Sequence, residues 1–325
     1  MSHYTHFTIE EREKSRVMFE KGFSIRAIAK ELNRSPSSVK REFERNSNKD
    51  GTYSANAAEK RYRQRRKSCG RKPMLVSDSP MKDYVIHRLE QQWSPEEISG
   101  RAKVEEKEFS ISYNTIYRAV AAGYIPKTYR KNFRLKHIKN RKRKKDDKRG
   151  NIADRVMIAD RPEYINNRSE FGHWEADTVL GKRGTDCLGT LVERKCGYLI
   201  SFKIPHRRDD VFKTACVNAF SEVPTLLKKS MTVDNGTEFT SHKELSAETN
   251  MDIYFCDPYS PWQRGSNENT NHLLRQYFPK GSSFNDFDDK QLAFVVNLLN
   301  NRPRKRLGFK TPNEVLSSYL LKCCT

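Results

Sequence analysis

Three acidic residues are candidates for chemistry in a strongly basic chain. Asp177 lies inside the strand-like run FGHWEADTVL, Asp234 ends the run KSMTVDNG, and Glu268 lies among amides in SPWQRGSNENTNHLLRQYF. Aspartate disfavours the interior of a strand, so Asp177 needs a functional reason. Carboxylates of this kind hold the two divalent ions, about 3.5–4 Å apart, that catalyse phosphoryl transfer. We therefore treat Asp177, Asp234 and Glu268 as candidate catalytic residues.

The elements around these acids predict an α/β domain. From about residue 165, three strand-like runs are followed by alternating helix and strand patterns. Alternation along the first run places Glu175, Asp177 and Val179 on one face. Asp234 would end a strand, where α/β sheets place their sites, although Asp-Asn-Gly alone is also a simple turn signal. With Ser266 as N-cap, Glu268 would lie in the first turn of the next helix.

Polar residues around Glu268 are candidate DNA contacts. Three lie at i+3, i+4 and i+7 from Glu268, on one helical face, where helix packing is the alternative role: Asn271, His272 and Arg275. Three more precede the helix: Trp262, Gln263 and Arg264. Trp262 could stack on a base or serve as a core anchor. Three further acids are weaker candidates for metal ligands, because none has a comparable setting: Glu175, Glu193 and Asp257.

Composition favours a polyanionic partner. The 325 residues include 62 Lys and Arg against 41 Asp and Glu, a formal charge of +21. Nucleic acid is the commonest partner for such an excess, with an anionic membrane as the rival. The sequence has no apolar run of about 18 residues, no secretory signal pattern and no lipidation motif. The seven cysteines form no CxxC or zinc spacing, so we expect reduced thiols.

The N-terminal residues 1–48 predict a helix-turn-helix domain. Ser24 would cap the second of three short helices, and Ser35, followed by Pro36, would cap the third. A small helical bundle with a solvated charged face is the alternative. The outward side chains expected to meet DNA are Arg34, Ser37, Ser38, Lys40, Arg41 and Arg45. Residues 49–80 follow as a basic linker, in which Gly70 and Pro73 interrupt any helix.

Residues 81–125 predict a second helix-turn-helix-like domain. Ser94 and Glu97 form a capping-box pattern, and Ser112 or Asn114 would cap the last helix. Scaffolding or self-association is the alternative to DNA contact. The outward candidates for DNA contact are Asn114, Thr115 and Arg118. A highly basic linker, residues 126–164, then leads to the α/β domain at 165–325. Within it, residues 127–149 carry 13 Lys or Arg, which favours phosphate tracking.

The three acids, with 33 residues between Asp234 and Glu268, resemble those of the DDE transposases and integrases. Longer segments are similar to the IS-thirty family of bacterial insertion-sequence transposases, as is the N-terminal helix-turn-helix. These segments are GHWEADTVLG, VDNGTEF, YFCDPYSPWQRGSNENTNHLLRQYFPKG and NNRPRKRLGFKTPNEVL. The resemblance covers nearly the whole chain.

The resemblance implies an RNase H-like catalytic domain in which Asp177, Asp234 and Glu268 hold two Mg²⁺ or Mn²⁺ ions. It implies binding to the terminal inverted repeats of an insertion sequence, strand cleavage, and joining of the 3′-hydroxyl to target DNA. A homodimer or larger homo-oligomer would hold both ends, in the bacterial cytoplasm at the nucleoid and without membrane contact. A DNA-binding regulator with a degenerate domain, or a metal-dependent nuclease without strand joining, are the alternatives.

Overall fold

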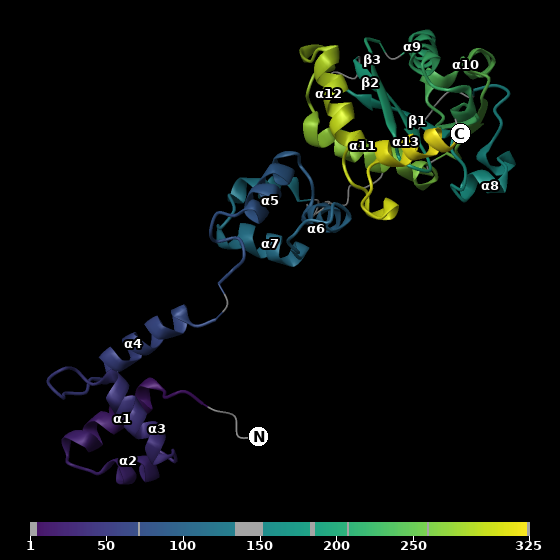
Figure 1. Cartoon of the computed structure of the whole chain (residues 1–325). Coiled ribbons are helices and arrows are strands. Elements are labelled where there is room, and N and C mark those ends of the chain that lie inside the picture. The colour runs from purple at the N-terminus through teal and green to yellow at the C-terminus, as the bar shows by residue number, and fades with distance from the viewer. Residues whose placement is uncertain are drawn as a thin grey trace. The chain divides into compact units, whose positions relative to one another are not determined.

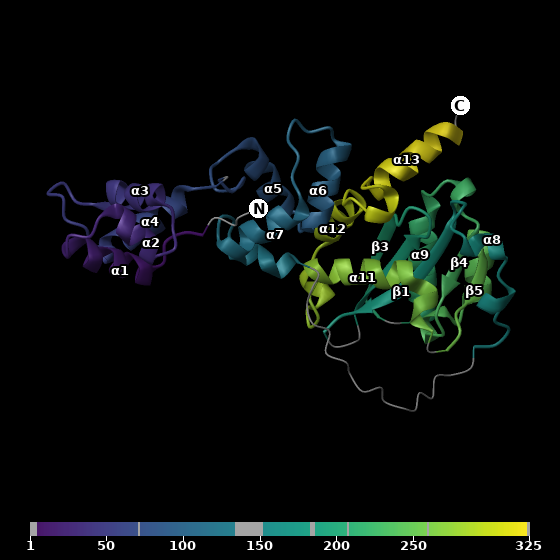
Figure 2. The same ribbon diagram turned by 90° about the horizontal axis from the view of Figure 1, so that it is seen from below.

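The computed structural model describes residues 5–70, 72–133, 152–182, 186–206, 208–258 and 260–323 (Figures 1 and 2). The chain forms two compact units, Met1–Pro73 and Met74–Thr325. Residues 134–151, which include most of the segment expected to track phosphates, lie outside the described residues, as does Cys324. The cysteines in the described part are free thiols. No helix in that part is long and apolar enough to cross a membrane.

The first unit contains α1 (Ile9–Glu20), α2 (Ile25–Glu31), α3 (Pro36–Asn46) and α4 (Ala55–Ser68). Ser24 and Ser35 accept hydrogen bonds from the backbone of the first turns of α2 and α3, which confirms both predicted caps. Side chains of α2 and α3 share one core with residues that lead into α4. Its buried members include Ile28, Val39, Phe43, Tyr53 and Ala58. The first three helices thus form the expected helix-turn-helix arrangement.

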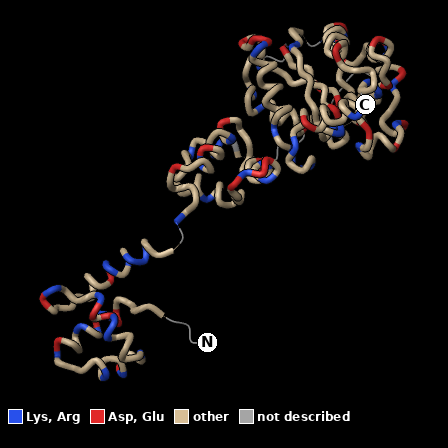
Figure 3. The backbone as a smooth tube through the Cα atoms, viewed as in Figure 1, with Lys and Arg blue, Asp and Glu red and all other residues tan. Residues whose placement is uncertain are grey.

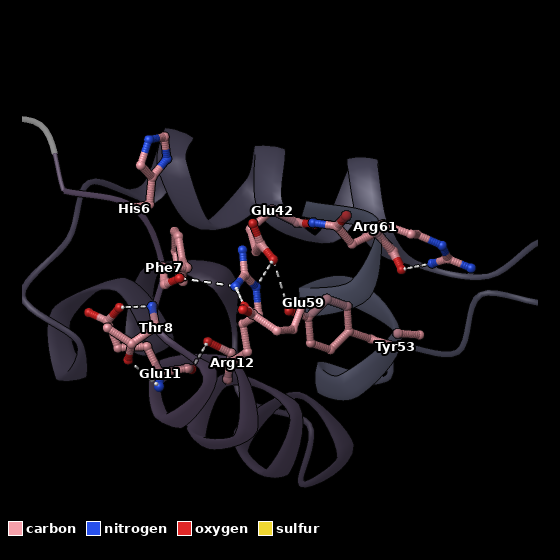
Figure 4. Close-up of polar contacts among 12 residues, drawn as sticks. His6, Phe7, Thr8, Glu11, Arg12, Glu42, Tyr53, Glu59 and Arg61 are labelled. Carbon is pink, nitrogen blue, oxygen red and sulfur yellow. Dashed lines mark hydrogen bonds and ion pairs between the residues drawn. The ribbon is translucent and has the colours of Figure 1, made fainter. Parts of the chain in front are cut away.

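Helix α4 corrects the prediction of a linker over residues 49–80. Ser54 caps α4, and Figure 3 shows that Lys and Arg are concentrated along it. These residues are good helix formers, so their charge does not prevent a helix. Arg12, only 1% exposed, is buried between α1, α3 and α4. Its guanidinium donates to Glu42 at 2.8 Å and is also paired with Glu59 on α4 (Figure 4).

The second unit begins with the helices α5 (Pro80–Glu90), α6 (Pro95–Val104) and α7 (Tyr113–Ala122). The capping box of Ser94 and Glu97 and the cap at Ser112 are confirmed. Gly123 ends α7 with a φ of 86°, a left-handed conformation that glycine adopts at little cost. The three helices enclose a core of their own, whose fully buried members include Val85, Leu89, Ile98, Ile116 and Val120.

The remainder of this unit is built on one mixed sheet. Its strands are β1 (His173–Leu180), β2 (Cys187–Glu193), β3 (Leu199–Ile204), β4 (Ser230–Val233) and β5 (Asp252–Phe255). Their order is β3-β2-β1-β4-β5. The pairs β1–β2 and β2–β3 are antiparallel, whereas β4 runs parallel to both β1 and β5. The predicted α/β layout is therefore present.

Helices cover both faces of this sheet. Side chains of α9 (Asp209–Ser221) and α10 (His242–Thr249) pack with Trp174 of β1, and those of α11 (Gly265–Tyr277) and α12 (Asp289–Asn300) pack with Val179. Asp177 shares the face of Val179, as the alternation predicts, and so it faces α11. The remaining α-helices are α8 (Glu163–Asn166) and α13 (Pro312–Cys323). Short 3₁₀ helices lie at Lys127–Asn132, Ile158–Asp160, Thr225–Leu227, Thr237–Phe239, Pro261–Arg264, Phe284–Asp286 and Lys305–Leu307.

The three helices α5–α7 contact the sheet domain through ion pairs distant in sequence. The Arg302 side chain, 0% exposed, donates to Glu97 at 2.9 Å and to Gln276 of α11 at 2.8 Å. Arg101 of α6 pairs with Glu314 of α13 through two hydrogen bonds, one of 2.8 Å. The second helical domain is therefore packed against the helix that carries Glu268.

Candidate active site

Asp177 and Asp234 lie side by side on neighbouring parallel strands. The pairing of β1 with β4 runs from His173 opposite Ser230 to Glu175 opposite Thr232. Continuing this register by two residues places Asp177 opposite Asp234, directly after β4. Both side chains are partly exposed, at 23% and 28%. The strand geometry thus brings two of the three predicted acids to one point.

Arg264 bridges these two aspartates. Its Nη1 lies 3.1 Å from Oδ1 of Asp177, and its Nη2 lies 2.9 Å from Oδ2 of Asp234. Burial raises the pKa of Asp177; Arg264 opposes that shift, and the charge of Asp234 adds to it. Burial alone would lower the pKa of Arg264, but the two carboxylates outweigh it, so this pKa is raised. Asp177 and Asp234 therefore bind a positive charge between them.

Glu268 lines the same groove, which has a volume of about 600 Å³. Its side chain is exposed, one turn along α11 from Arg264. Asn271, the next residue on that face, donates from Nδ2 to Oδ2 of Asp177 at 2.9 Å. The groove is lined by Asp177, Thr178, Val179, Leu180, Gly181, Arg264, Glu268, Asn271, His272, Arg275, Lys280 and Gly281. It is thus acidic at Asp177 and Glu268 and basic beyond them.

The donor set fits a divalent cation in type, because hard carboxylate oxygens of two strands already converge on one positive group. Glu268 does not complete a cluster with them: across the described ranges, no three His, Cys, Asp or Glu side chains gather closely enough to hold a metal ion. Carboxylates repel one another unless a cation lies between them. With Arg264 compensating the two aspartates, nothing draws Glu268 to the pair.

The start of α11 is held by a buried acid. Glu175, 0% exposed, accepts from the backbone amides of Ser266 at 2.9 Å and Asn267 at 3.0 Å through Oε2. Its Oε1 accepts from Arg194 at 3.1 Å. The prediction that Ser266 caps this helix is wrong: α11 begins at Gly265, and Glu175 satisfies its first amides. Glu175 therefore has a structural partner on each oxygen.

The two other weaker candidates for metal ligands, Glu193 and Asp257, also have local hydrogen-bond partners. Glu193 is buried at the end of β2, where it accepts from the amide of Cys196 at 2.7 Å. Burial raises the pKa of Glu193, and the hydrogen bond from Cys196 opposes that shift. Asp257 accepts from Nε2 of Gln263 at 2.8 Å and donates its amide to Oε1 of the same side chain. Gln263, expected at DNA, is thus paired with its neighbour.

Glu238 is an acid near the site that sequence reasoning missed. It lies in the 3₁₀ turn after Asp234, is 3% exposed, and accepts from the hydroxyl of Thr178 at 2.7 Å. It links the end of β1 to the loop after β4, so it helps to fix Asp234 beside Asp177. Its position four residues after Asp234 was the feature of the sequence that could have indicated a place near the site.

The candidate DNA contacts of the first domain differ in their exposure and in their contacts within the domain. Lys40, Arg41 and Arg45 are exposed on α3, as is Ser37, whereas Ser38 is half-buried. Arg34 pairs with Glu11 at 2.8 Å, donates to two backbone carbonyls and stacks on Phe7. Its guanidinium is therefore used within the domain.

The remaining DNA candidates lie on the second unit. Asn114 and Arg118 are exposed on α7, and Thr115 is half-buried. His272 is exposed, and Arg275 is half-buried with a hydrogen bond to the carbonyl of Leu180. Trp262 is 69% exposed, which rules out the alternative that it is a core anchor.

Known families match both halves of the chain. Residues 3–46 match the family described as "Helix-turn-helix domain", and residues 167–261 match "Integrase core domain". The transposase InsI of insertion sequence element IS30C from Escherichia coli is 39% identical over 323 residues, 96% of this chain and 83% of that protein. The chain belongs to the IS30 family of transposases.

Other members of the IS30 family are similarly close. The transposase of IS1086 from Cupriavidus metallidurans is 36% identical over 98% of this chain and 96% of its own. That of IS4351 from Bacteroides fragilis is 36% identical over 95% and 94%. The predicted RNase H-like domain is confirmed by the integrase core match, a type of domain that carries out phosphoryl transfer on DNA. Glu268 lies beyond the matched residues.

Proposed function

We propose that this transposase binds the terminal inverted repeats of an insertion sequence, cuts the strand at each end, and joins the freed 3′-hydroxyl to target DNA. The proposal is supported by the convergence of Asp177 and Asp234 on Arg264, which lines the same groove as Asp177 and Glu268. When bound by these three carboxylates, two Mg²⁺ or Mn²⁺ ions supply activation of the attacking oxygen and charge compensation at the leaving oxygen.

Both steps are displacements at phosphorus. In cleavage, a water oxygen attacks the phosphodiester, the bond from phosphorus to the 3′ oxygen breaks, and that oxygen takes a proton to become a 3′-hydroxyl. In joining, this hydroxyl loses its proton, attacks a target phosphodiester, and releases the target's 3′ oxygen. Asn271 orients Asp177, and Glu175 fixes the start of the helix that carries Glu268. Basic side chains along the groove, such as His272, Arg275 and Lys280, bind the phosphates on either side.

DNA binding is divided among several surfaces in this proposal. The exposed face of α3 reads the repeat through Ser37, Lys40, Arg41 and Arg45. Asn114, Thr115 and Arg118 of α7 add contacts, and Trp262 stacks on a base at the cut end. Two ends are handled in one reaction, so a homodimer or larger homo-oligomer is the active assembly.

A labelled duplex of the element's end tests the proposal. The wild-type chain with Mg²⁺ should nick it at the terminal phosphodiester, and Asp177→Asn, Asp234→Asn and Glu268→Gln should bind the duplex normally without nicking it. Binding without nicking by the wild type would point to the DNA-binding regulator. Nicking without any joined product would point to the plain nuclease.

A further inference from the structure

Arg264 occupies the space between the two aspartates as a cation. Besides its two ion pairs, it donates from Nη1 to the carbonyl of Ala176 at 3.0 Å, and its side chain is only 12% exposed. One guanidinium therefore satisfies carboxylates from two different strands, Asp177 and Asp234. Its planar fork suits such bridging, because each nitrogen can serve a different oxygen.

The same contacts conflict with a divalent ion. A cation that binds Oδ1 of Asp177 and Oδ2 of Asp234 needs the oxygens that Arg264 now uses. Glu268 lies one helical turn after Arg264 and faces the same groove. Departure of the guanidinium would uncover both aspartates and leave its positive charge free to pair with another anion.

We infer that Arg264 is a built-in counter-ion: it holds Asp177 and Asp234 together before metal binds, competes with the metal for them, and moves to a DNA phosphate when displaced. The inference rests on the proposed function, since it assigns the aspartates to a divalent cation. This competition couples metal binding to DNA binding, because a DNA phosphate that engages Arg264 removes the group that competes with the metal. By linkage, end DNA then tightens metal binding by the same factor by which metal tightens DNA binding.

Mn²⁺ titration of the full chain, followed by calorimetry, tests this competition. Arg264→Gln should bind Mn²⁺ at least about tenfold more tightly than wild type, a gain of about 1.4 kcal/mol. Arg264→Lys, whose point charge cannot serve both carboxylates, should fall between them. Without metal, Arg264→Gln should melt below wild type, and saturating Mn²⁺ should remove most of that difference. End DNA should tighten Mn²⁺ binding in wild type and have little effect in Arg264→Gln.

Arg101→Gln is the matched control. Arg101 also bridges two carboxylates, Glu105 at 2.9 Å and Glu314, but lies outside the groove. Arg101→Gln removes the same charge as Arg264→Gln and should leave the affinity for Mn²⁺ unchanged. If both Arg264 variants bind Mn²⁺ no more tightly than wild type, the inference is overturned. If the wild type nicks end DNA, that result leaves the proposed function intact; a wild type that neither binds Mn²⁺ nor nicks overturns both.

Discussion

The Oε2 atom of Glu175 lies 3.0 Å from the backbone amide nitrogen of Asn267, although the two residues are 92 positions apart in the chain. This contact joins β1 to the start of α11. Asp177 lies two residues after Glu175, and Glu268 directly follows Asn267. Together with the hydrogen bond from the amide of Ser266 to the same oxygen, it fixes the spacing between the strand and the helix that carry two of the three proposed catalytic acids.

Substituting Glu175 should damage catalysis beyond its cost in stability. Glu175→Gln leaves Arg194 buried without its carboxylate, which costs about 3–5 kcal/mol. It also loosens the start of α11 and misplaces Glu268, so the nicking rate of the folded protein should fall at least about tenfold. Single-turnover nicking, corrected for the folded fraction, measures this.

The control for this prediction is Glu193→Gln. Glu193 is also buried and also accepts a backbone amide, but from Cys196 rather than from α11. It should lower stability and leave the rate of the folded protein near wild type. Equal rate losses in the two variants would mean that Glu175 has no special role in placing α11.

The exposed basic face of α3 should supply affinity for the end DNA. Replacing Lys40 and Arg41 by Ala should weaken binding and reduce the slope of log K against log salt by about 0.9 for each phosphate that the protein no longer neutralises. Filter binding over a salt series gives both quantities. A matched pair on α1, Lys14→Ala with Arg16→Ala, removes the same charge elsewhere; if it weakens binding equally, α3 is not the recognition surface.

Arg34 should prove to be a stability residue rather than a DNA contact. Burial would raise the pKa of Glu11, but its bonds with Arg34 and Thr8 outweigh this and lower the pKa below its ordinary value of 4.5. The folded state then binds protons less readily than the unfolded state, so the stabilisation is complete above pH 4.5 and is lost as the pH falls through the folded pKa.

Arg34→Gln should remove much of this pH dependence from the first unit. Hydrogen exchange of α3 amides between about pH 6 and about pH 3, corrected for intrinsic rates, measures it. Wild type should lose protection as the pH falls below the usual range of Glu11, whereas the variant should begin with less protection and change less. Parallel profiles for the two proteins would show that the Glu11–Arg34 pair does not stabilise this unit.

The buried pair of Glu97 and Arg302 should hold the second helical domain on α11. Glu97→Ala strands the Arg302 guanidinium and removes a helix cap, at a cost of about 3–5 kcal/mol. The melting temperature of the full chain should fall by about 10 °C. Replacing both residues by Met should recover most of the loss, and exposed Glu108→Ala should change little. An unchanged melting temperature for Glu97→Ala would contradict this account.

Local chemistry made much of this fold predictable. Alternation in β1 was enough to place Asp177 on one face with Glu175 and Val179. The types and positions of Ser24, Ser35, Ser94 and Ser112 were enough to predict the starts of their helices. Helix α4 was missed because a run of Arg and Lys resembles a solvated linker. Its packing depends on Arg12, a contact that no local pattern contains.

The parts of the site that escaped prediction depend on contacts distant in sequence. The sequence predicted that Arg264 contacts DNA, but it did not indicate that Arg264 bridges two aspartates from neighbouring strands. Ser266 was a reasonable N-cap by type, but α11 begins one residue earlier, at Gly265, and a carboxylate from β1 accepts from the amides of Ser266 and Asn267. Such partners are set by the register of β1 against β4 and by the packing of β1 against α11, which a single sequence does not reveal.

The role of Glu268 as the third carboxylate is tested most directly by strand joining. A pre-nicked end duplex with a free 3′-hydroxyl is incubated with plasmid DNA and Mg²⁺, and the joined product is counted for wild type and Glu268→Gln at equal DNA occupancy. We predict joining by the wild type and none above background by the variant. Joining by Glu268→Gln at the wild-type rate would contradict the assignment.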